Sequence, residues 1–273
     1  MPKPSEKSRR QRNPRQKNPM GERRQPSAAG GQIWLYGHHA ISAALANPRR
    51  HCHRLLATEE ALARLGSRAQ RPGLEIQTVS RGEIDLRLGA ETVHQGLALA
   101  VDPLPRLSLA AALASSPEMP SDGARDLVLV LDQINDPHNL GAILRSAAAF
   151  SVRAVVVPAR RSADLGGAAA KAASGALDLV PLVEVSNLAA ALEELKDLGY
   201  WRLALDGHAE TPIADAPHFE RAALVLGAEG AGLRRLILER SDLAVRLPIA
   251  PAMESLNVSV AAGIALYALS AGA

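Results

Sequence analysis

Two polar side chains, Asn139 and Arg145, lie in a helical pattern that directly follows the apolar segment 127–131. The Asn-Asp-Pro sequence at 135–137 is typical of a turn, so Asn139 or its neighbour is expected to cap the helix. An arginine beside Leu144 in such a helix is not expected to be wholly solvated. Taken alone, Arg145 is better explained by a structural ion pair or by packing of its aliphatic stem than by a ligand.

A second candidate segment is the glycine-rich loop 226–233, Leu-Gly-Ala-Glu-Gly-Ala-Gly-Leu. Its glycine spacing differs from the dinucleotide-binding fingerprint, and it lacks the lysine and hydroxyl residues of a phosphate-binding P-loop. The glycines permit a ligand to approach the backbone closely. Glu229 in this loop is either a charge favoured at the start of a helix or a carboxylate of a site, and the residue alone does not decide.

The third segment, 247–259, connects an apolar strand pattern to the last helical pattern and contains Ser255, Asn257 and Ser259. Ser255 is well placed to cap that helix. Asn257, a poor helix former, is predicted to lie in the first turn, where capping by Ser255 does not explain it. A buried amide needs hydrogen-bonding partners, which a ligand can supply.

All three segments follow predicted strands of one alternating pattern that begins at Asp126. Apolar strands are predicted at 127–131, 154–157, 180–183, 202–205, 222–226 and 243–247, and helices at 139–150, 167–174, 187–198, 232–239 and 255–270. Near-continuous apolar strands that alternate with helices indicate an α/β fold with a parallel sheet covered on both faces. Ligands of such folds bind at the carboxyl ends of the strands, which is where the three segments lie.

A smaller α/β unit precedes this pattern. Its predicted helices span 38–46 and 59–68, with a third opened by a Ser80–Glu83 capping box, and its predicted strands span 54–57, 74–79 and 96–101. Residues 104–125 are rich in proline, contain one short Leu/Ala-rich helix and have the composition of a linker. The chain is therefore divided into a tail 1–31, a unit 32–103, a linker 104–125 and a unit 126–273.

Positive charge is concentrated at the start of the chain. Residues 1–30 hold nine Lys/Arg and two Glu, a net charge of +7, which leaves −4 of the formal total of +3 for residues 31–273. Without apolar periodicity, this tail is predicted to be disordered, and it either solubilises the chain or anchors it non-specifically to RNA. Aromatic residues make up only 3%, which argues against RNA-binding modules that stack bases on aromatic platforms.

Cys52 is the only cysteine, which excludes an intrachain disulfide and a cysteine-rich zinc site and favours a reducing compartment. His51 and His53 point to one side of an extended segment and Cys52 to the other. Because two ligands do not make a metal site, no metal is expected. The sequence shows no signal-peptide core and no apolar run that spans a bilayer, so a cytoplasmic protein without a membrane partner is expected.

Together the three segments resemble the SpoU branch of the SPOUT methyltransferases. The matching motifs are Asn-Asp-Pro-His-Asn-Leu-Gly-x-Ile-x-Arg, Gly-Ala-Glu-Gly-x-Gly and Leu-Pro…Ser-Leu-Asn-Val-Ser, in family order over residues 127–273. The stretch from Tyr-Gly-His-His-Ala-Ile at 36–41 to Val-His-Gln-Gly-Leu at 93–97 resembles the accompanying L30e-like RNA-binding domain. This layout is similar to bacterial ribosomal-RNA guanosine 2′-O-methyltransferases of the TrmH/RlmB type.

The resemblance implies a trefoil knot in the C-terminal unit, S-adenosylmethionine as cofactor, and a homodimer with the site near the subunit interface. It implies methylation of a ribose 2′-hydroxyl in RNA, most simply a guanosine of 23S ribosomal RNA. Gly227, Leu247 and Leu256 are implied to contact the cofactor, largely through backbone atoms. The implied catalytic residues are Asn139, Arg145, Glu229, Ser255 and Asn257.

Methyl transfer from a sulfonium mainly requires an oxygen nucleophile positioned in line. Arg145 is the family's proposed activating residue, although a guanidinium ordinarily stays protonated. Either strong desolvation makes Arg145 a base, or Arg145 binds the adjacent phosphate and stabilises a developing alkoxide, and the chemistry of arginine favours the second role. Ser255 and Asn257 are then expected to orient the ribose. Asn139 is expected to hold Arg145, and Glu229 to fix its own loop.

Three other functions fit parts of the pattern: a transfer-RNA 2′-O-methyltransferase, a non-catalytic ribosomal RNA-binding protein, and a nucleotide-dependent oxidoreductase. The unit 32–103 argues against the simplest transfer-RNA enzymes of this type. Intact Arg145, Glu229 and Asn257 argue against a non-catalytic protein. The glycine spacing of the 226–233 loop argues against an oxidoreductase.

Overall fold

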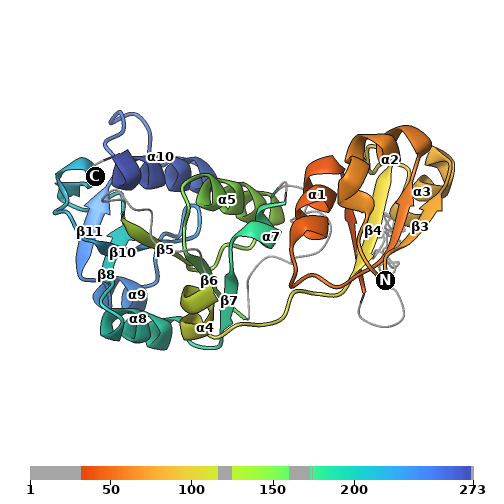
Figure 1. Ribbon diagram of the computed structural model, residues 1–273. Coiled ribbons are helices and arrows are strands. Elements are labelled where there is room, and N and C mark those ends of the chain that lie inside the picture. The colour runs from red at the N-terminus through yellow and green to blue at the C-terminus, as the bar shows by residue number, and fades with distance from the viewer. Residues whose placement is uncertain (1–31, 116–124, 160–172, 174, 272–273) are drawn as a thin grey trace, which may run out of the picture.

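The computed structural model describes residues 32–115, 125–159, 173 and 175–271. They form two units, each built around one sheet, which lie at opposite ends of the molecule in Figure 1. The predicted tail 1–31 and most of the predicted helix 167–174 lie outside the described residues. Among the described residues, no helix combines the length and the apolarity needed to cross a bilayer.

The first unit has a four-stranded sheet in the order β1 (Ile33–Tyr36), β4 (Leu97–Val101), β2 (Cys52–Ala57), β3 (Glu75–Thr78). Strand β4 runs antiparallel to both of its neighbours, whereas β2 and β3 are parallel. The helical elements are α1 (His38–Ala46), α2 (Glu59–Leu65), the 3-10 turn η1 (Gly66–Ala69) and α3 (Arg81–Leu88). The predicted capping box of α3 is confirmed, since Ser80 and Glu83 each bond the other's backbone amide.

The second unit has seven strands, all parallel, which confirms the predicted α/β fold. Their order is β7 (Leu182–Val185), β6 (Ala154–Pro158), β5 (Asp126–Leu131), β10 (Arg221–Leu226), β8 (Trp201–Leu205), β11 (Leu243–Arg246), β9 (Thr211–Pro212). The strand predicted at 180–183 begins two residues later, because Val180 ends the short helix α7 (Ala176–Leu179).

Helices cover both faces of the seven-stranded sheet (Figure 1). On one face lie α5 (Pro137–Ala149), α7 and α10 (Val258–Ala271); on the other lie α4 (Leu109–Ser115), α8 (Leu188–Asp197) and α9 (Arg235–Glu239). Alternation along β5 explains this, since Leu129 packs into the first core and Val130 into the second. Although α4 falls in the predicted linker, its Leu109 and Ala112 are buried in the second core, so this helix belongs to the large sheet.

The two units meet where α1 packs against α7 (Figure 1). Arg50 follows α1, and its guanidinium binds both carboxylate oxygens of Asp178 in α7 at 2.8 and 3.1 Å. Asn47 donates to the same carboxylate at 2.9 Å. The side chains of Arg50 and Asp178 are both buried, so breaking this pair at the junction leaves an uncompensated charge.

Candidate active site

The three candidate segments converge at the carboxyl ends of the strands. Strands β5 and β10 are neighbours in the sheet, so the segments after Leu131 and Leu226 lie side by side. Strand β11 lies beyond β8, yet the chain after it returns to the same place. There Asn257 Nδ2 donates to Asn139 Oδ1 at 3.0 Å and to Glu229 Oε2 at 3.3 Å. Three predicted site residues, one from each segment, therefore meet.

Asn257 also starts the last helix. Its Oδ1 accepts from the Ser259 amide at 3.0 Å, the Ser259 hydroxyl at 2.6 Å and the Val260 amide at 3.4 Å, which is the pattern of an N-cap. The prediction that Ser255 caps this helix is therefore wrong, because α10 begins at Val258. One end of the Asn257 amide caps the helix, and the other end reaches the site.

Asn139 lies inside its helix and does not cap it. The N-cap of α5 is Asp136, which accepts from the His138 amide at 2.9 Å, and Pro137 occupies the first helical position, where no N–H is needed. The half-buried Asn139 side chain is thereby left to accept from Asn257. The expected bond from Asn139 to Arg145 is not formed, because the Asn139 oxygen faces Asn257 instead.

The glycine-rich loop is a tight turn. The backbones of Ala228 and Gly232 exchange two hydrogen bonds, of 3.1 and 2.9 Å, and this pulls Gly227 against Gly232. A Cβ on Gly227 would lie 2.2 Å from the Gly232 carbonyl carbon, so no other residue fits there. Glu229 lies at the exposed end of this turn, with its carboxylate on Asn257. Helix α9 consequently begins at Arg235 and not at 232 as predicted.

Sequence reasoning missed the pair that anchors this loop. Asp132 directly follows β5, and its side chain is fully buried. Its carboxylate accepts from the Arg234 guanidinium at 2.8–3.0 Å and from the Arg234 backbone amide at 3.1 Å. The pair ties the end of β5 to the end of the glycine-rich loop. The available signal was a charged residue directly after a strand that is buried on both faces.

Arg145 and Ser255 form no hydrogen bond or ion pair with the three converging residues in the described part of the chain. Arg145 is exposed on α5 and forms no hydrogen bond or ion pair with the residues that the structure describes. It is six positions after Asn139, a rotation of about 240° around the helix, so the two side chains leave it in different directions. Ser255 is exposed in the segment before α10.

The segment 247–256 presents backbone atoms that a ligand can bind. Within the described part of the chain, Met253 N to Ala250 O is the one hydrogen bond recorded among its backbone groups. The half-buried Leu247 and Leu256 lie at its two ends. Backbone groups that pair with no described residue, next to apolar side chains, are common in ligand pockets, and the cofactor contacts of Leu247 and Leu256 stay a prediction.

Comparisons with known proteins decide the family. The model of the SpoU rRNA methylase family matches residues 126–267, and a model described as RNA 2′-O ribose methyltransferase substrate binding matches residues 34–107. The 23S rRNA (guanosine-2′-O-)-methyltransferase RlmB of Xanthomonas campestris pv. campestris is 38% identical over 242 residues, which cover 86% of this chain and 94% of that protein.

The chain belongs to the SpoU rRNA methylase family. The RlmB protein of Pseudomonas aeruginosa is 39% identical over 241 residues, covering 85% of this chain and 94% of its own length. The SpoU methyltransferase AviRb of Streptomyces viridochromogenes, solved with AdoMet, shares the fold at a TM-score of 0.73 and 22% identity, over 88% of this chain and 90% of that one. The resemblance of the three motifs to SpoU methyltransferases is thus confirmed, and the knot stays a prediction.

Proposed function

We propose that this SpoU family member transfers a methyl group from S-adenosylmethionine to the 2′-hydroxyl of a guanosine in 23S ribosomal RNA. The observation that carries the proposal is the meeting of Asn139, Glu229 and Asn257 at 3.0 and 3.3 Å, because each comes from a different family motif. The relatives named for this reaction align over 85–86% of the chain, which supports the same substrate class.

Gly227, Leu247 and Leu256 are proposed to hold S-adenosylmethionine through their backbone atoms. The tight turn at Gly227 supports this assignment, and so does the backbone of 247–256, which forms few hydrogen bonds with the described residues. When bound, the cofactor supplies an electrophilic methyl group on a sulfonium. The oxygens of Glu229 and Asn139 are suited to a site for this cation because they are, respectively, charged and polar acceptors.

The remaining proposed roles belong to the RNA side of the site. Ser255 is exposed in the segment 247–256 that is proposed to hold the cofactor, and it orients the ribose together with Asn257. The position of Asn257 is fixed by its hydrogen bonds to Glu229 and Asn139. Arg145 binds the phosphate next to the target ribose and stabilises the negative charge that develops on the 2′-oxygen, whose proton passes to solvent water. Its exposure and lack of a described partner within the chain leave its charge available for this contact.

The unit 32–103 is proposed to bind the RNA, as an L30e-like domain beside the methyltransferase unit 126–273. The match of residues 34–107 to a substrate-binding family model supports this role. The buried Arg50–Asp178 pair joins the two units, which places an RNA bound to the first unit next to the second.

We also propose that the chain acts in the cytoplasm as a homodimer. Val260, Ile264 and Tyr267 lie four and three residues apart on one side of α10 and are 50%, 45% and 64% exposed. Such an apolar stripe suits burial against a second copy of the chain. A Tyr267→Glu variant is expected to sediment as a monomer in analytical ultracentrifugation, and an unchanged dimer would contradict this interface.

Mass spectrometry of nuclease-digested RNA tests the proposed reaction. Large-subunit rRNA from cells that lack the enzyme is incubated with the purified chain and S-adenosylmethionine carrying a labelled methyl group, with transfer RNA in parallel. Labelled 2′-O-methylguanosine in rRNA alone is expected. Label in transfer RNA alone would keep the chemistry and overturn the substrate. Label in neither would favour a non-catalytic RNA-binding protein.

A further inference from the structure

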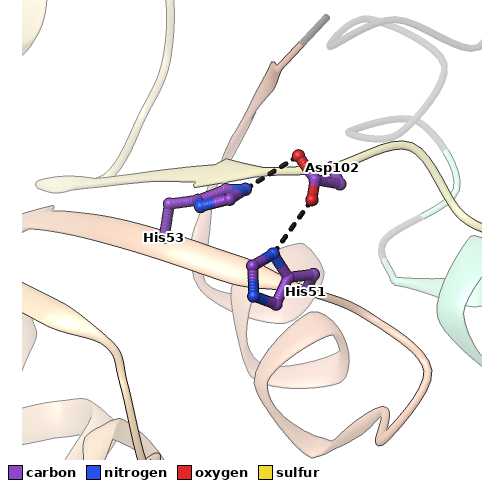
Figure 2. A group of neighbouring side chains, drawn as sticks. All are labelled: His51, His53 and Asp102. Atoms are coloured by element: carbon purple, nitrogen blue, oxygen red, sulfur yellow. Dashed lines mark hydrogen bonds and ion pairs between the residues drawn. The ribbon is translucent and has the colours of Figure 1, made fainter. Parts of the chain in front are cut away.

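A cluster of two imidazoles and one carboxylate lies in the first unit. His51 precedes β2, His53 lies in β2 and Asp102 follows β4; Figure 2 shows both rings pointing toward the Asp102 carboxylate. His51 Nδ1 is 2.9 Å from Asp102 Oδ2, and His53 Nε2 is 2.7 Å from Oδ1. The three ligand atoms lie within 4.8 Å of one another. The proposed methyl transfer gives this cluster no task.

A β-bulge aims His53 at the cluster. Cys52 pairs with Val101 and Arg54 with the preceding Ala100, so His53 is the extra residue on its strand. Bulges re-aim a side chain and are frequent at functional sites. Cys52 points the other way, into the core, with its Sγ 3.8 Å from the Ala44 carbonyl oxygen. The two histidines therefore share one side of the strand, and the thiol is excluded.

Backbone bonds hold the ligands in place. The Asp102 amide donates to the His51 carbonyl at 3.0 Å, which joins the start of β2 to the end of β4. The Asp102 carbonyl accepts from Arg50 Nη1 at 3.0 Å, and Arg50 is fixed by the buried Asp178. Ligands on a rigid backbone lose little conformational entropy on binding an ion.

We propose that His51, His53 and Asp102 bind a divalent transition-metal ion, with Zn²⁺ as the reference ion. Two imidazoles and a carboxylate suit zinc and its neighbours, whereas Mg²⁺ and Ca²⁺ prefer oxygen ligands. Tetrahedral zinc with bonds of about 2.1 Å places two ligand atoms roughly 3.4 Å apart. The two separations from the Asp102 oxygens, 2.9 and 2.7 Å, would open by about 0.5 and 0.7 Å, and all three ligand atoms already lie within 4.8 Å of one another, so small side-chain rotations bring them to an ion.

The surroundings leave a fourth position for water. The side chain of His51 is 72% exposed and that of Asp102 is 42% exposed. The two histidines border a polar hollow of about 410 Å³ that also contains Arg54 and Glu75. Arg54 is paired with Glu75 at 2.9 Å, so its charge does not stand unopposed beside the ion. Three protein ligands and one exchangeable position form a site open to solvent.

The expectation of no metal counted only His51 and His53, and Asp102 is 49 residues further along the chain from His53. An ion at this site would hold the side chain of Asp102. The backbone carbonyl of Asp102 already accepts a hydrogen bond from Arg50, which lies at the junction of the two units. Because the unfolded chain does not assemble the three ligands, the ion binds the folded state preferentially and raises the melting temperature.

The test is calorimetric titration of Zn²⁺ into the full chain, made without a histidine tag and freed of metal by a chelator that is then removed. One ion per chain is expected. Co²⁺ is added in a parallel sample, where the visible absorption of a four-coordinate site is expected. Absence of both signals in the wild-type chain would overturn the proposal without reference to any variant.

The decisive variant is His51→Asn, since a 72% exposed side chain is not needed for folding. Affinity is expected to fall more than about 100-fold, beyond the 10–100-fold that loss of an outer-shell partner costs. The matched control is His208→Asn, the same change at an exposed histidine of the second unit, which is expected to keep wild-type affinity. Wild-type affinity in His51→Asn would place the ion elsewhere and overturn the site.

Discussion

Asn257 and Asn139, 118 residues apart in the chain, are joined by a hydrogen bond of 3.0 Å from Nδ2 to Oδ1. The oxygen of the same Asn257 side chain accepts from the Ser259 and Val260 amides and so caps α10. One side chain thus begins the last helix and connects it to α5 and to Glu229. Capping and the site contact use opposite ends of the amide, so the two can be separated by substitution.

Replacement of Asn257 by Asp is expected to keep the cap of α10 and lose activity. Asp caps a helix as well as Asn does, but it cannot donate to Asn139 and adds a second carboxylate beside Glu229. Methyl transfer is expected to fall by about 100-fold or more, the usual effect of removing one aligned donor from a site. Asn257→Ala is the comparison, since it loses both functions and about 1 kcal/mol of stability. Thermal denaturation measures the loss of the helix cap, and single-turnover methylation measures the loss of the site contact. An active Asn257→Asp enzyme would contradict the site assignment.

Gly227→Ala is expected to displace the turn that holds the cofactor. The added Cβ would lie 2.2 Å from the backbone of Gly232, which is not a flexible side chain that can move aside. A cost of about 1–3 kcal/mol in stability and loss of S-adenosylmethionine binding by calorimetry are expected. Gly207→Ala is the matched control, because its Cβ would meet nothing within 4 Å. Equal cofactor affinity in both variants would contradict the role of the turn.

Local patterns predicted the second unit well. Strand β5 was expected from its uninterrupted apolar residues, since a strand covered on both faces shows no alternation. Helix ends were less predictable. Ser255 and Asn257 are both good caps, and the choice between them depends on where the chain meets Asn139 and Glu229, which lie far away in the sequence. The choice of cap therefore depends on tertiary contacts, which local sequence patterns do not show.

In the candidate site too, local motifs predicted some residues, whereas others depend on contacts between distant parts of the chain. Asn139, Glu229 and Asn257 were named because family motifs contain them, and the structure brings them together. The anchor from Asp132 to Arg234 was missed, because the position of Asp132 after a buried strand indicates a polar partner but does not show which residue, 102 positions away, supplies it. The separation of Arg145 from Asn139 follows from their spacing of six residues, because helical rotation points the two side chains in different directions, and the expected contact between them is not formed.

Arg145→Ala is expected to abolish methyl transfer without affecting folding or cofactor binding. The side chain is exposed and forms no hydrogen bond or ion pair with the described residues, so stability is expected to change by no more than about 0.5 kcal/mol. Loss of the phosphate contact and of alkoxide stabilisation is expected to lower turnover by about 100-fold or more. Turnover is followed with labelled S-adenosylmethionine, and cofactor affinity by calorimetry. Arg235→Ala, at an exposed arginine of α9, controls for loss of one positive charge; retained turnover in Arg145→Ala would reject the assignment.

Asp242 and Arg202 are expected to make part of the stability pH-dependent. The side chain of Arg202 is 5% exposed and donates to both Asp242 oxygens, at 2.9 and 2.7 Å. These hydrogen bonds hold the pKa of Asp242 below its ordinary value of 3.8. A depressed folded-state pKa means that the stabilisation is present above pH 3.8 and is lost as the pH falls below it, through the folded-state pKa.

Asp242→Asn is therefore expected to lower the free energy of unfolding by about 1.5–3 kcal/mol at neutral pH, the range for hydrogen bonds to charged groups. The difference from the wild type is expected to shrink steadily below pH 3.8. Urea denaturation at a series of pH values measures it. Glu239→Gln serves as the control, since its pair with Arg235 is exposed and is worth no more than about 0.5 kcal/mol at any pH. A difference that stays constant into the acid range would show that Asp242 stabilises the chain by shape and not by charge.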